Sequence, residues 1–296
     1  MKRPVKILLW LLGVPLGLVL LGALALWLWQ PNMFGEAELD TEPPVLPDTI
    51  TRNAVLVYSK TSGGFRHSEA IEAANAMIGR FAEKHGWEVF YTENAAIFER
   101  EYLEKFAVVI WNNATGAALS ADQRLRFRTW LEGGGGYVGL HAAGDGSHAN
   151  WEWYTEKVIK VPYNQHTLFP EHMPRATLYS ENRMRHLAAS GLPESWETEE
   201  EWYAFEYSPR TRGSTILVRV DESTYEPGKA SMGEDHPMVW THGAGLGRVF
   251  YSAFGHTEQA YSDPILEPMM EKAVIWAGWY HRRKPIQLAP GTVELQ

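Results

Sequence analysis

Histidines follow the ends of three of the segments that are expected to form strands. The pairs are His67 after the apolar run 54–58, His141 after 137–140, and His256 after 248–253. Imidazole titrates near neutral pH, and its nitrogens are common metal ligands. Because ligands of open α/β sheets bind outside the carboxyl ends of the strands, these histidines predict one site for proton transfer or metal binding.

Other polar residues are candidates for the same site. Asn113 follows the expected strand 107–111 and Asp145 lies just beyond the fourth strand, where both would bind substrate hydroxyls. Arg66 precedes the first histidine. Glu201 is a candidate partner carboxylate, although the acidic residues Glu197, Glu199 and Glu200 leave a solvated stretch as the alternative. Tyr203 and Trp240 offer flat apolar faces for a ligand, with core packing as the alternative.

The segments that must position these residues alternate between strand and helix. The apolar run at 54–58 is typical of a strand buried on both faces, and further strands are expected at 87–91, 107–111 and 137–140. Ser68 and the Ser120-Ala121-Asp122-Gln123 capping box are expected to open helices between them. The alternation predicts an α/β domain with a doubly wound, mostly parallel sheet.

The second half of the chain has a weaker pattern. Strands are expected at 215–220 and 248–253, and an apolar helical face runs from Leu266 to Ala277. Residues 150–210 show no clear period. We therefore expect a single domain, residues 52–285, with an irregular insertion at 150–210 and a tail at 286–296.

The start of the chain has a separate composition. Residues 7–29 are uncharged and mostly apolar, and a helix over them would reach about 34 Å, enough to cross a hydrocarbon core of about 30 Å. The basic head, residues 1–6, would stay in the cytoplasm and the rest would lie outside it. This predicts a signal anchor, a Pro- and acid-rich linker at 30–51, and a single-pass membrane protein with a periplasmic domain. A signal peptide cleaved near 23–25 is the alternative.

Composition excludes several classes of function. The 296 residues carry a formal net charge of −9, which argues against nucleic acid as a partner. There is no cysteine, so disulfides, thiolate metal sites and a cysteine nucleophile are excluded. No G-x-G-x-x-G follows the first strand, so no nucleotide cofactor is expected.

Five motifs between Val55 and about Tyr280 resemble those of ThuA-like (trehalose utilisation) domains, in the family's order. They are the segment 56–67, Gly139-Leu140-His141-Ala142-Ala143-Gly144-Asp145, Glu201-Trp202-Tyr203, Asp235-His236-Pro237-Met238-Val239-Trp240, and the segment 247–256. The resemblance implies a flavodoxin-like fold similar to class I glutamine amidotransferases. It also implies carbohydrate utilisation, including keto-sugars derived from disaccharides. His236 and His166 are retained as contacts on this resemblance, although Gln165 stands where the family has glycine, and His186 is not retained.

The amidotransferase comparison narrows the chemistry. In that fold the turn after a central strand presents a cysteine, whereas this chain has His141 there and no G-x-S-x-G elbow. A cysteine amidotransferase is therefore excluded. Proton transfer, metal ligation or substrate binding stay open for His141, which we expect on an exposed turn with little packing.

We therefore expect a membrane-anchored enzyme of carbohydrate utilisation that acts on a sugar or keto-sugar derivative by histidine acid/base chemistry. It would be of hydrolase, isomerase or lyase type. The expected catalytic residues are His141, His67, His256 and Glu201, and the expected substrate-binding residues are Arg66, Asn113, Asp145, His166, Tyr203, His236 and Trp240. A variant assisted by a divalent metal stays open, although no tight ligand spacing such as H-x-x-x-H occurs. A non-catalytic module that binds carbohydrate or a partner on a membrane stalk is the alternative.

Overall fold

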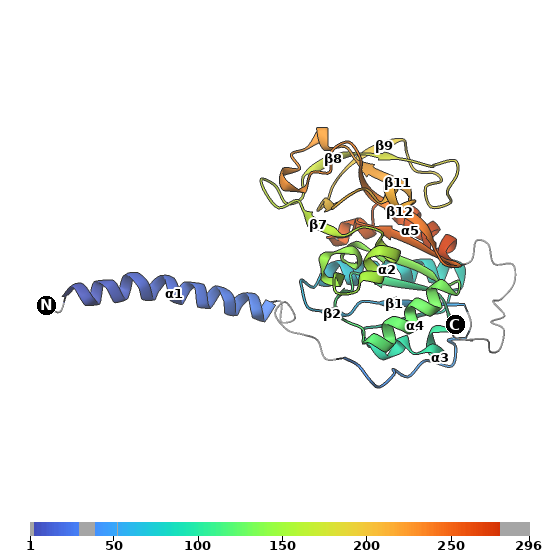
Figure 1. Cartoon of the computed structure of the whole chain (residues 1–296), viewed down its shortest axis with the longest axis horizontal. Coiled ribbons are helices and arrows are strands. Elements are labelled where there is room, and N and C mark those ends of the chain that lie inside the picture. Colours follow the sequence, from blue (N-terminus) through green and yellow to red (C-terminus); the bar gives the residue numbers. More distant parts are fainter. Residues whose placement is uncertain (1–2, 30–38, 52, 279–296) are drawn as a thin grey trace.

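A nine-stranded sheet forms the centre of the computed structural model, which describes residues 3–29, 39–51 and 53–278 (Figure 1). Along the sheet the strands are β3 (Val89–Thr92), β1 (Ala54–Tyr58), β4 (Phe106–Asn112), β6 (Gly136–Leu140), β13 (Gly247–Ser252), β12 (His236–Ala244), β11 (Thr215–Val220), β8 (Arg175–Ser180) and β9 (Ser195–Glu199). The strands expected from the sequence are all present, and their ends agree with the expected ones to within two residues.

Five neighbouring strands, from β3 to β13, are parallel. Numbered along the chain, their spatial order is 2-1-3-4-5, which is the flavodoxin-like order. The prediction of a flavodoxin-like, doubly wound sheet is confirmed for this half. The chain passes from β1 to β3 in one direction and then returns across β1 to β4, so the switch point lies between β1 and β4.

The other half of the sheet, from β13 to β9, is antiparallel. Since β12 and β13 are joined by a short turn at Gly245, they can pair only in antiparallel fashion. The prediction of a mostly parallel sheet was therefore too strong, because parallel and antiparallel pairs are equally numerous.

Residues 150–210, expected to be irregular, contain regular elements. β8 and β9 extend the main sheet, and β7 (Tyr163–His166) pairs with β10 (Tyr203–Phe205) in a separate ribbon. A further short pair is β2 (Thr61–Ser62) with β5 (Thr115–Gly116). A π-helical turn, η5, covers Tyr154–Ile159. The β7–β10 ribbon matters for function because it ends next to the histidines described below.

Helices cover both faces of the parallel strands. The longer ones are α2 (Ser68–His85), α4 (Ala121–Glu132) and α5 (Leu266–Gly278), with a short α3 (Arg100–Leu103). Adjacent residues of β4 show the two faces: Trp111 stacks on Phe127 of α4 at 5.6 Å, whereas the Asn112 amide donates to the Ile71 carbonyl of α2 at 3.0 Å. Successive strand residues point to opposite faces, so α2 and α4 lie on opposite sides of the sheet. The 3₁₀ helices are η2 (Ala95–Phe98), η3 (His141–Gly144), η4 (Gly146–His148), η6 (Pro209–Arg212), η7 (Glu222–Thr224), η8 (Gly228–Ala230) and η9 (Glu258–Tyr261).

The helix ends follow local rules with one exception. Ser120 forms the predicted capping box with Gln123, and Gly86 ends α2 in the left-handed conformation at φ 66°. At the start of α2, however, Ser68 is already helical and His67 holds the N-cap position without a side-chain capping hydrogen bond. A residue that makes a poor cap stands where Ser, Thr, Asp or Asn is favoured, which indicates another role for its ring.

At the N-terminal end, α1 spans Arg3–Trp29 and contains Pro15. Within the described residues, no helix is both long enough and apolar enough to cross a membrane. The predicted membrane span is thus not supported by the structure, and its side chains at 7–13, 17 and 29 lie outside the described set. The predicted tail at 286–296 and the first part of the linker, 30–38, also lie outside it.

Candidate active site

The three histidines predicted to meet at the carboxyl edge of the sheet do meet there. The ring centroids of His67 and His141 are 4.9 Å apart, those of His67 and His256 5.1 Å, and those of His141 and His256 5.5 Å. They follow β1, β6 and β13, strands that are not all adjacent in the sheet. The predicted convergence is confirmed, and the roles of the three rings stay predictions.

His141 is fully buried, contrary to the expectation of an exposed turn. Its backbone has φ 46°, a left-handed conformation that is uncommon for a residue with a side chain, directly after β6. The ring Nδ1 lies 2.7 Å from the Ala253 carbonyl oxygen, an acceptor, so Nδ1 carries the proton. Nε2 therefore faces the other side chains of the site. Strain and burial of this kind are typical of functional positions.

Glu201 lies at the centre of the site and is only 4% exposed. Its Oε2 is 3.2 Å from His141 Nε2 and 3.2 Å from His256 Nδ1. Its Oε1 is 3.0 Å from His166 Nδ1 and 2.6 Å from His172 Nε2. The solvated acidic stretch considered from the sequence ends before this residue. We call His67, His141, His166, His172, Glu201 and His256 the histidine–glutamate cluster.

Glu200, the residue before Glu201, fixes the loops that carry the cluster. Its buried carboxylate accepts the backbone N–H of Gly255 at 2.9 Å, of Glu201 at 2.9 Å and of His256 at 3.3 Å. Burial raises the pKa of Glu200, and these N–H donors oppose that rise. Both oxygens act as acceptors, which ties the segment after β9 to the loop after β13.

Tyr203 completes the buried side of the cluster. Its hydroxyl is 3.1 Å from His141 Nε2, and the two rings are 4.4 Å apart. His236 lies beneath it, with Nε2 2.9 Å from the Tyr203 carbonyl oxygen and Nδ1 2.7 Å from a Glu222 oxygen. The structure therefore places His236 behind Tyr203 as support, rather than against a substrate as predicted.

Burial and neighbouring charges shift the pKa values of adjacent groups in the cluster in opposite directions. Burial, together with the nearby His141 and His256, lowers the pKa of His67 to about 2. For His141, burial lowers the pKa, but the Glu201 carboxylate outweighs that effect and raises it. Burial alone would raise the pKa of Glu201, whereas the imidazoles of His141, His166 and His256 bring it well below its usual range. Adjacent imidazoles with opposite shifts are typical of sites that move protons.

Four predicted substrate-binding residues have other partners. Arg66 forms a two-bond ion pair with Glu93 near the surface, and Asp145 accepts hydrogen bonds from Ser147 within its own loop. Asn113 is buried at φ 52° and donates to the Tyr261 hydroxyl at 2.8 Å. Trp240 is fully buried, and its indole donates to the Ile159 carbonyl oxygen at 3.0 Å.

Physical reasons account for these differences. Trp240 belongs to the core, where it packs against Tyr251 at 4.6 Å, because most of β12 is buried on both faces. Arg66 and His67 are consecutive, and only the second side chain faces the other histidines. The Asn113 amide donates to the Tyr261 hydroxyl, and Asp145 accepts the Ser147 N–H within its own tight loop.

His172 was not singled out from the sequence. It lies in the loop between β7 and β8, between Pro170 and Pro174, and is half-buried. Its ring is 5.6 Å from that of His166 and 4.9 Å from that of His256. The sequence offered one indication that His172 belongs to the site, namely that it is a second histidine six positions after His166.

The histidine–glutamate cluster contains two sets of possible metal ligands. His67, His141, Glu201 and His256 each offer one ligand atom, and His166, His172 and Glu201 form a second set; within each set the atoms lie within 4.8 Å of one another. Among the described residues, Nδ1 of His67 and Nδ1 of His256 have no hydrogen-bond partner. The arrangement can therefore transfer protons or bind a cation.

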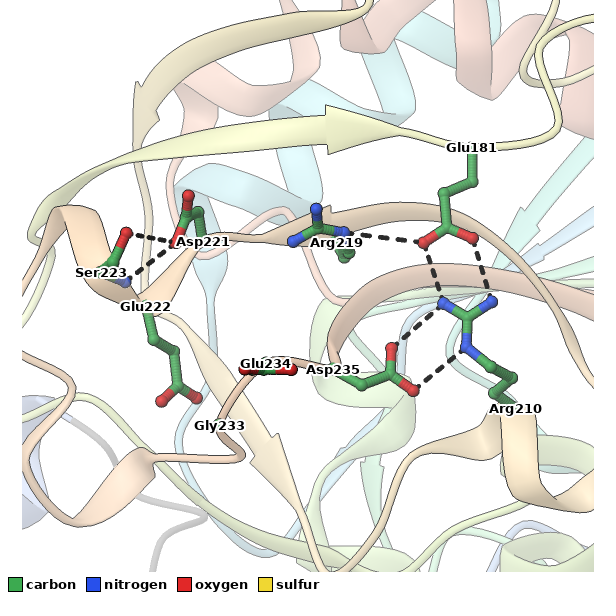
Figure 2. A pocket seen from close by; sticks show the side chains of 9 residues that line it. All are labelled: Glu181, Arg210, Arg219, Asp221, Glu222, Ser223, Gly233, Glu234 and Asp235. Carbon is green, nitrogen blue, oxygen red and sulfur yellow. Dashed lines mark hydrogen bonds and ion pairs between the residues drawn. The ribbon is translucent and has the colours of Figure 1, made fainter.

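A hollow of about 710 Å³ lies on the antiparallel half of the sheet and is a different feature (Figure 2). Arg210 is held there between Glu181 at 2.8 Å and Asp235 at 3.1 Å. The charged side chains that line it are largely paired with one another. Ion pairs of this kind near the surface contribute little to the stability of the fold. None of the cluster residues lines it, so we do not assign the reaction to this hollow.

Comparisons with known proteins agree with the fold. The family model described as "ThuA: Trehalose utilisation" matches residues 54–277. A ThuA-like protein from Bacteroides uniformis has a solved structure with a TM-score of 0.65 at 20% identity, covering 80% of this chain and 95% of that one. A ThuA-like protein from Parabacteroides merdae gives 0.53 at 15% identity, covering 77% and 90%. A cytoplasmic protein from Salmonella typhimurium LT2 gives 0.52 at 11% identity, covering 76% and 99%. At these identities the structures show the fold alone, and no curated protein matches.

Proposed function

Because the chain belongs to the ThuA (trehalose utilisation) family, we propose that it is an enzyme of carbohydrate utilisation whose reaction takes place at the histidine–glutamate cluster. The substrate would be a sugar or keto-sugar derivative, and imidazoles of the cluster would transfer the protons. The observation that carries the proposal is the buried Glu201 carboxylate, which four imidazoles contact at the carboxyl edge of the sheet. Collecting ionisable groups in this way opposes folding and is typical of reaction centres.

The geometry supports proton transfer next to a carbonyl group. The Ala253 carbonyl holds the His141 ring so that Nε2 faces Tyr203 and Glu201. A base of the cluster would remove a proton from a hydroxyl or from the carbon beside a carbonyl, and an acid on the other side would protonate the oxygen. Proton transfer from positioned side chains typically contributes about 10²–10⁴-fold in rate.

An apolar surface beside the cluster supports a sugar substrate. Phe65 is half-buried, with its ring edge-on to His67 at 4.8 Å and parallel to His256 at 6.4 Å. Aromatic rings of this kind offer a flat face together with polar neighbours that orient a ligand. The half-buried His166 and His172 lie on the outer side of Glu201, where a substrate would enter.

The experiment is to incubate the purified full-length chain with disaccharides and with the corresponding keto-disaccharides in D₂O. We expect the keto-sugars to be converted, with deuterium from solvent appearing at the carbon beside the carbonyl. Nuclear magnetic resonance would report both. Binding of these sugars without conversion or exchange, at any pH between 5 and 9, would favour the non-catalytic binding module instead.

We also propose that residues 7–29 anchor the domain in a membrane, with the domain outside the cytoplasm. The sequence supports this: the run is apolar and uncharged, and Lys2, Arg3 and Lys6 precede it. The described side chains of α1 include exposed Leu18 and Leu28, for which a lipid environment would be favourable.

A further inference from the structure

We infer that His67, His141, Glu201 and His256 bind one divalent transition-metal ion, of the class of Zn²⁺ or Mn²⁺. The inference deepens the proposed function, on which it rests for the substrate but not for the ion. The four ligand atoms come from four separate segments, after β1, β6, β9 and β13, yet lie within 4.8 Å of one another. Three imidazoles and one carboxylate are a donor set that suits such ions and does not suit Mg²⁺ or Ca²⁺.

The distances between the ligand atoms fit a single ion. Metal bonds to imidazole nitrogen or carboxylate oxygen are about 2.0–2.2 Å long, so two adjacent ligands of one ion lie about 2.8–3.6 Å apart in octahedral or tetrahedral geometry. Glu201 Oε2 is 3.2 Å from His141 Nε2 and 3.2 Å from His256 Nδ1. These are the separations that two edges of one coordination polyhedron would have.

Unpartnered buried nitrogen is the second, independent observation. His67 is 7% exposed, and its Nδ1 has no hydrogen-bond partner among the described residues. His256 Nδ1 is close to Glu201 but also makes no hydrogen bond in the described part of the chain. A buried polar atom without a partner costs about 1–3 kcal/mol, and an ion in the cluster would remove that cost for a nitrogen that ligates it. His67 is also the N-cap residue of α2, and its ring makes no capping hydrogen bond to that helix.

The surroundings of His141 match those of a metal ligand. Metal-binding histidines usually donate their other ring N–H to a carbonyl or carboxylate, which fixes the tautomer and the ring. His141 donates Nδ1–H to Ala253 O at 2.7 Å and keeps Nε2 toward Glu201. Gly255 and His256 are held in turn by Glu200, so the loop that supplies one ligand is fixed by a buried carboxylate.

The outer histidines have a different position. His166 and His172 contact the other oxygen of Glu201, and their side chains are 32% and 41% exposed. With the ion on the buried side, these two imidazoles stay free of it and are placed to exchange protons with a substrate. The ion would polarise a carbonyl or hydroxyl oxygen as a Lewis acid.

The test uses the full-length chain purified in mild detergent without chelators, analysed for metals by elemental mass spectrometry. After stripping with EDTA, Zn²⁺, Mn²⁺, Co²⁺ and Ni²⁺ are each titrated by calorimetry, and Co²⁺ also by its visible absorption. We expect about one ion per chain, and at least a tenfold weaker affinity in His67→Ala and in His256→Asn. His85→Gln is the matched control, because His85 lies at the far end of α2 beside Glu271, and it should bind the ion as wild type does.

Folding is checked by circular dichroism, and the half-buried His256 keeps the test informative if His67→Ala does not fold. Absence of binding for all four ions, wild-type affinity in a folded His256→Asn variant, or two ions per chain would overturn the inference. Its failure is distinguishable from that of the proposed function. Conversion of sugars by protein that binds none of the four ions would refute the ion alone, whereas one bound ion without conversion of any sugar would refute the function alone.

Discussion

The adjacent carboxylates Glu200 and Glu201 should respond differently to the same substitution. Glu201→Gln keeps the side-chain volume but removes the charge that four imidazoles contact. We expect turnover to fall by about 10²–10⁴-fold, the usual range for loss of a proton-transfer group. Stability of the metal-free protein should also fall, because the imidazoles that lower the pKa of Glu201 lose the buried carboxylate that they contact.

Glu200→Gln should mainly reduce stability. The carboxylate accepts Gly255 N–H on one oxygen, and the N–H groups of Glu201 and His256 on the other. An amide has one acceptor oxygen, so at least one buried N–H loses its partner, at about 1–3 kcal/mol. For a domain of this size, each kcal/mol lowers Tm by about 2–4 °C, so the expected decrease is about 2–12 °C.

The two effects are measured by thermal unfolding of the EDTA-treated proteins and by turnover of the same proteins before EDTA treatment. Metal must be absent from the unfolding experiment, since an ion bound to the native state would itself shift Tm. Glu199→Gln is the control, because Glu199 is exposed at the end of β9 and should change neither property. Activity of Glu201→Gln within tenfold of wild type, or an unchanged Tm for Glu200→Gln, would refute these assignments.

Three further predictions concern single residues and topology. His141→Ala and His141→Gln should both lose at least about 10²-fold in turnover; a Gln variant that recovers kcat and differs only in KM would show that the residue merely binds substrate. Burial lowers the pKa of His186 to about 4, below the usual value of about 6.5, so the unfolded chain binds the extra proton and stability should fall as pH drops from 6.5 to 4. The fall from this residue is at most about 1.4 kcal/mol per pH unit, and urea unfolding of His186→Gln should show a flatter profile over that range. A reporter fused after Gln296 should be active only outside the cytoplasm, and cytoplasmic activity would contradict the proposed anchor and its orientation.

The parallel half of the fold could be predicted because its strands carry the required signals. Residues 54–58 and 107–111 are short β-branched runs, which is typical of strands buried on both faces, and both lie within observed strands. The direction of β12 could not be predicted, because its buried residues do not show which neighbour it pairs with. The short turn at Gly245 makes β12 pair with β13 in antiparallel fashion, and the strands beyond β12 continue this pairing to the edge of the sheet.

The candidate site was predictable to the extent that chain position determines where a side chain lies. His67, His141 and His256 follow strand ends, and strand ends of a parallel sheet share one edge. Arg66 and Trp240 were misplaced, because a shift of one residue in a loop, or burial on both faces of a strand, changes which side chains face the site. These distinctions depend on tertiary packing, which local patterns do not encode.

Positions where the chain departs from local rules coincide with the cluster. His67 stands at an N-cap without capping, and His141 adopts a left-handed backbone after β6. Asn113 does the same after β4, where its amide holds Tyr261, whose hydroxyl donates in turn to the Gly255 carbonyl beside His256. Each departure opposes folding, and each places or supports an imidazole at the same edge of the sheet. These departures occur in separate segments of the chain but meet at one place. Binding or chemistry at the histidine–glutamate cluster therefore explains them better than packing does.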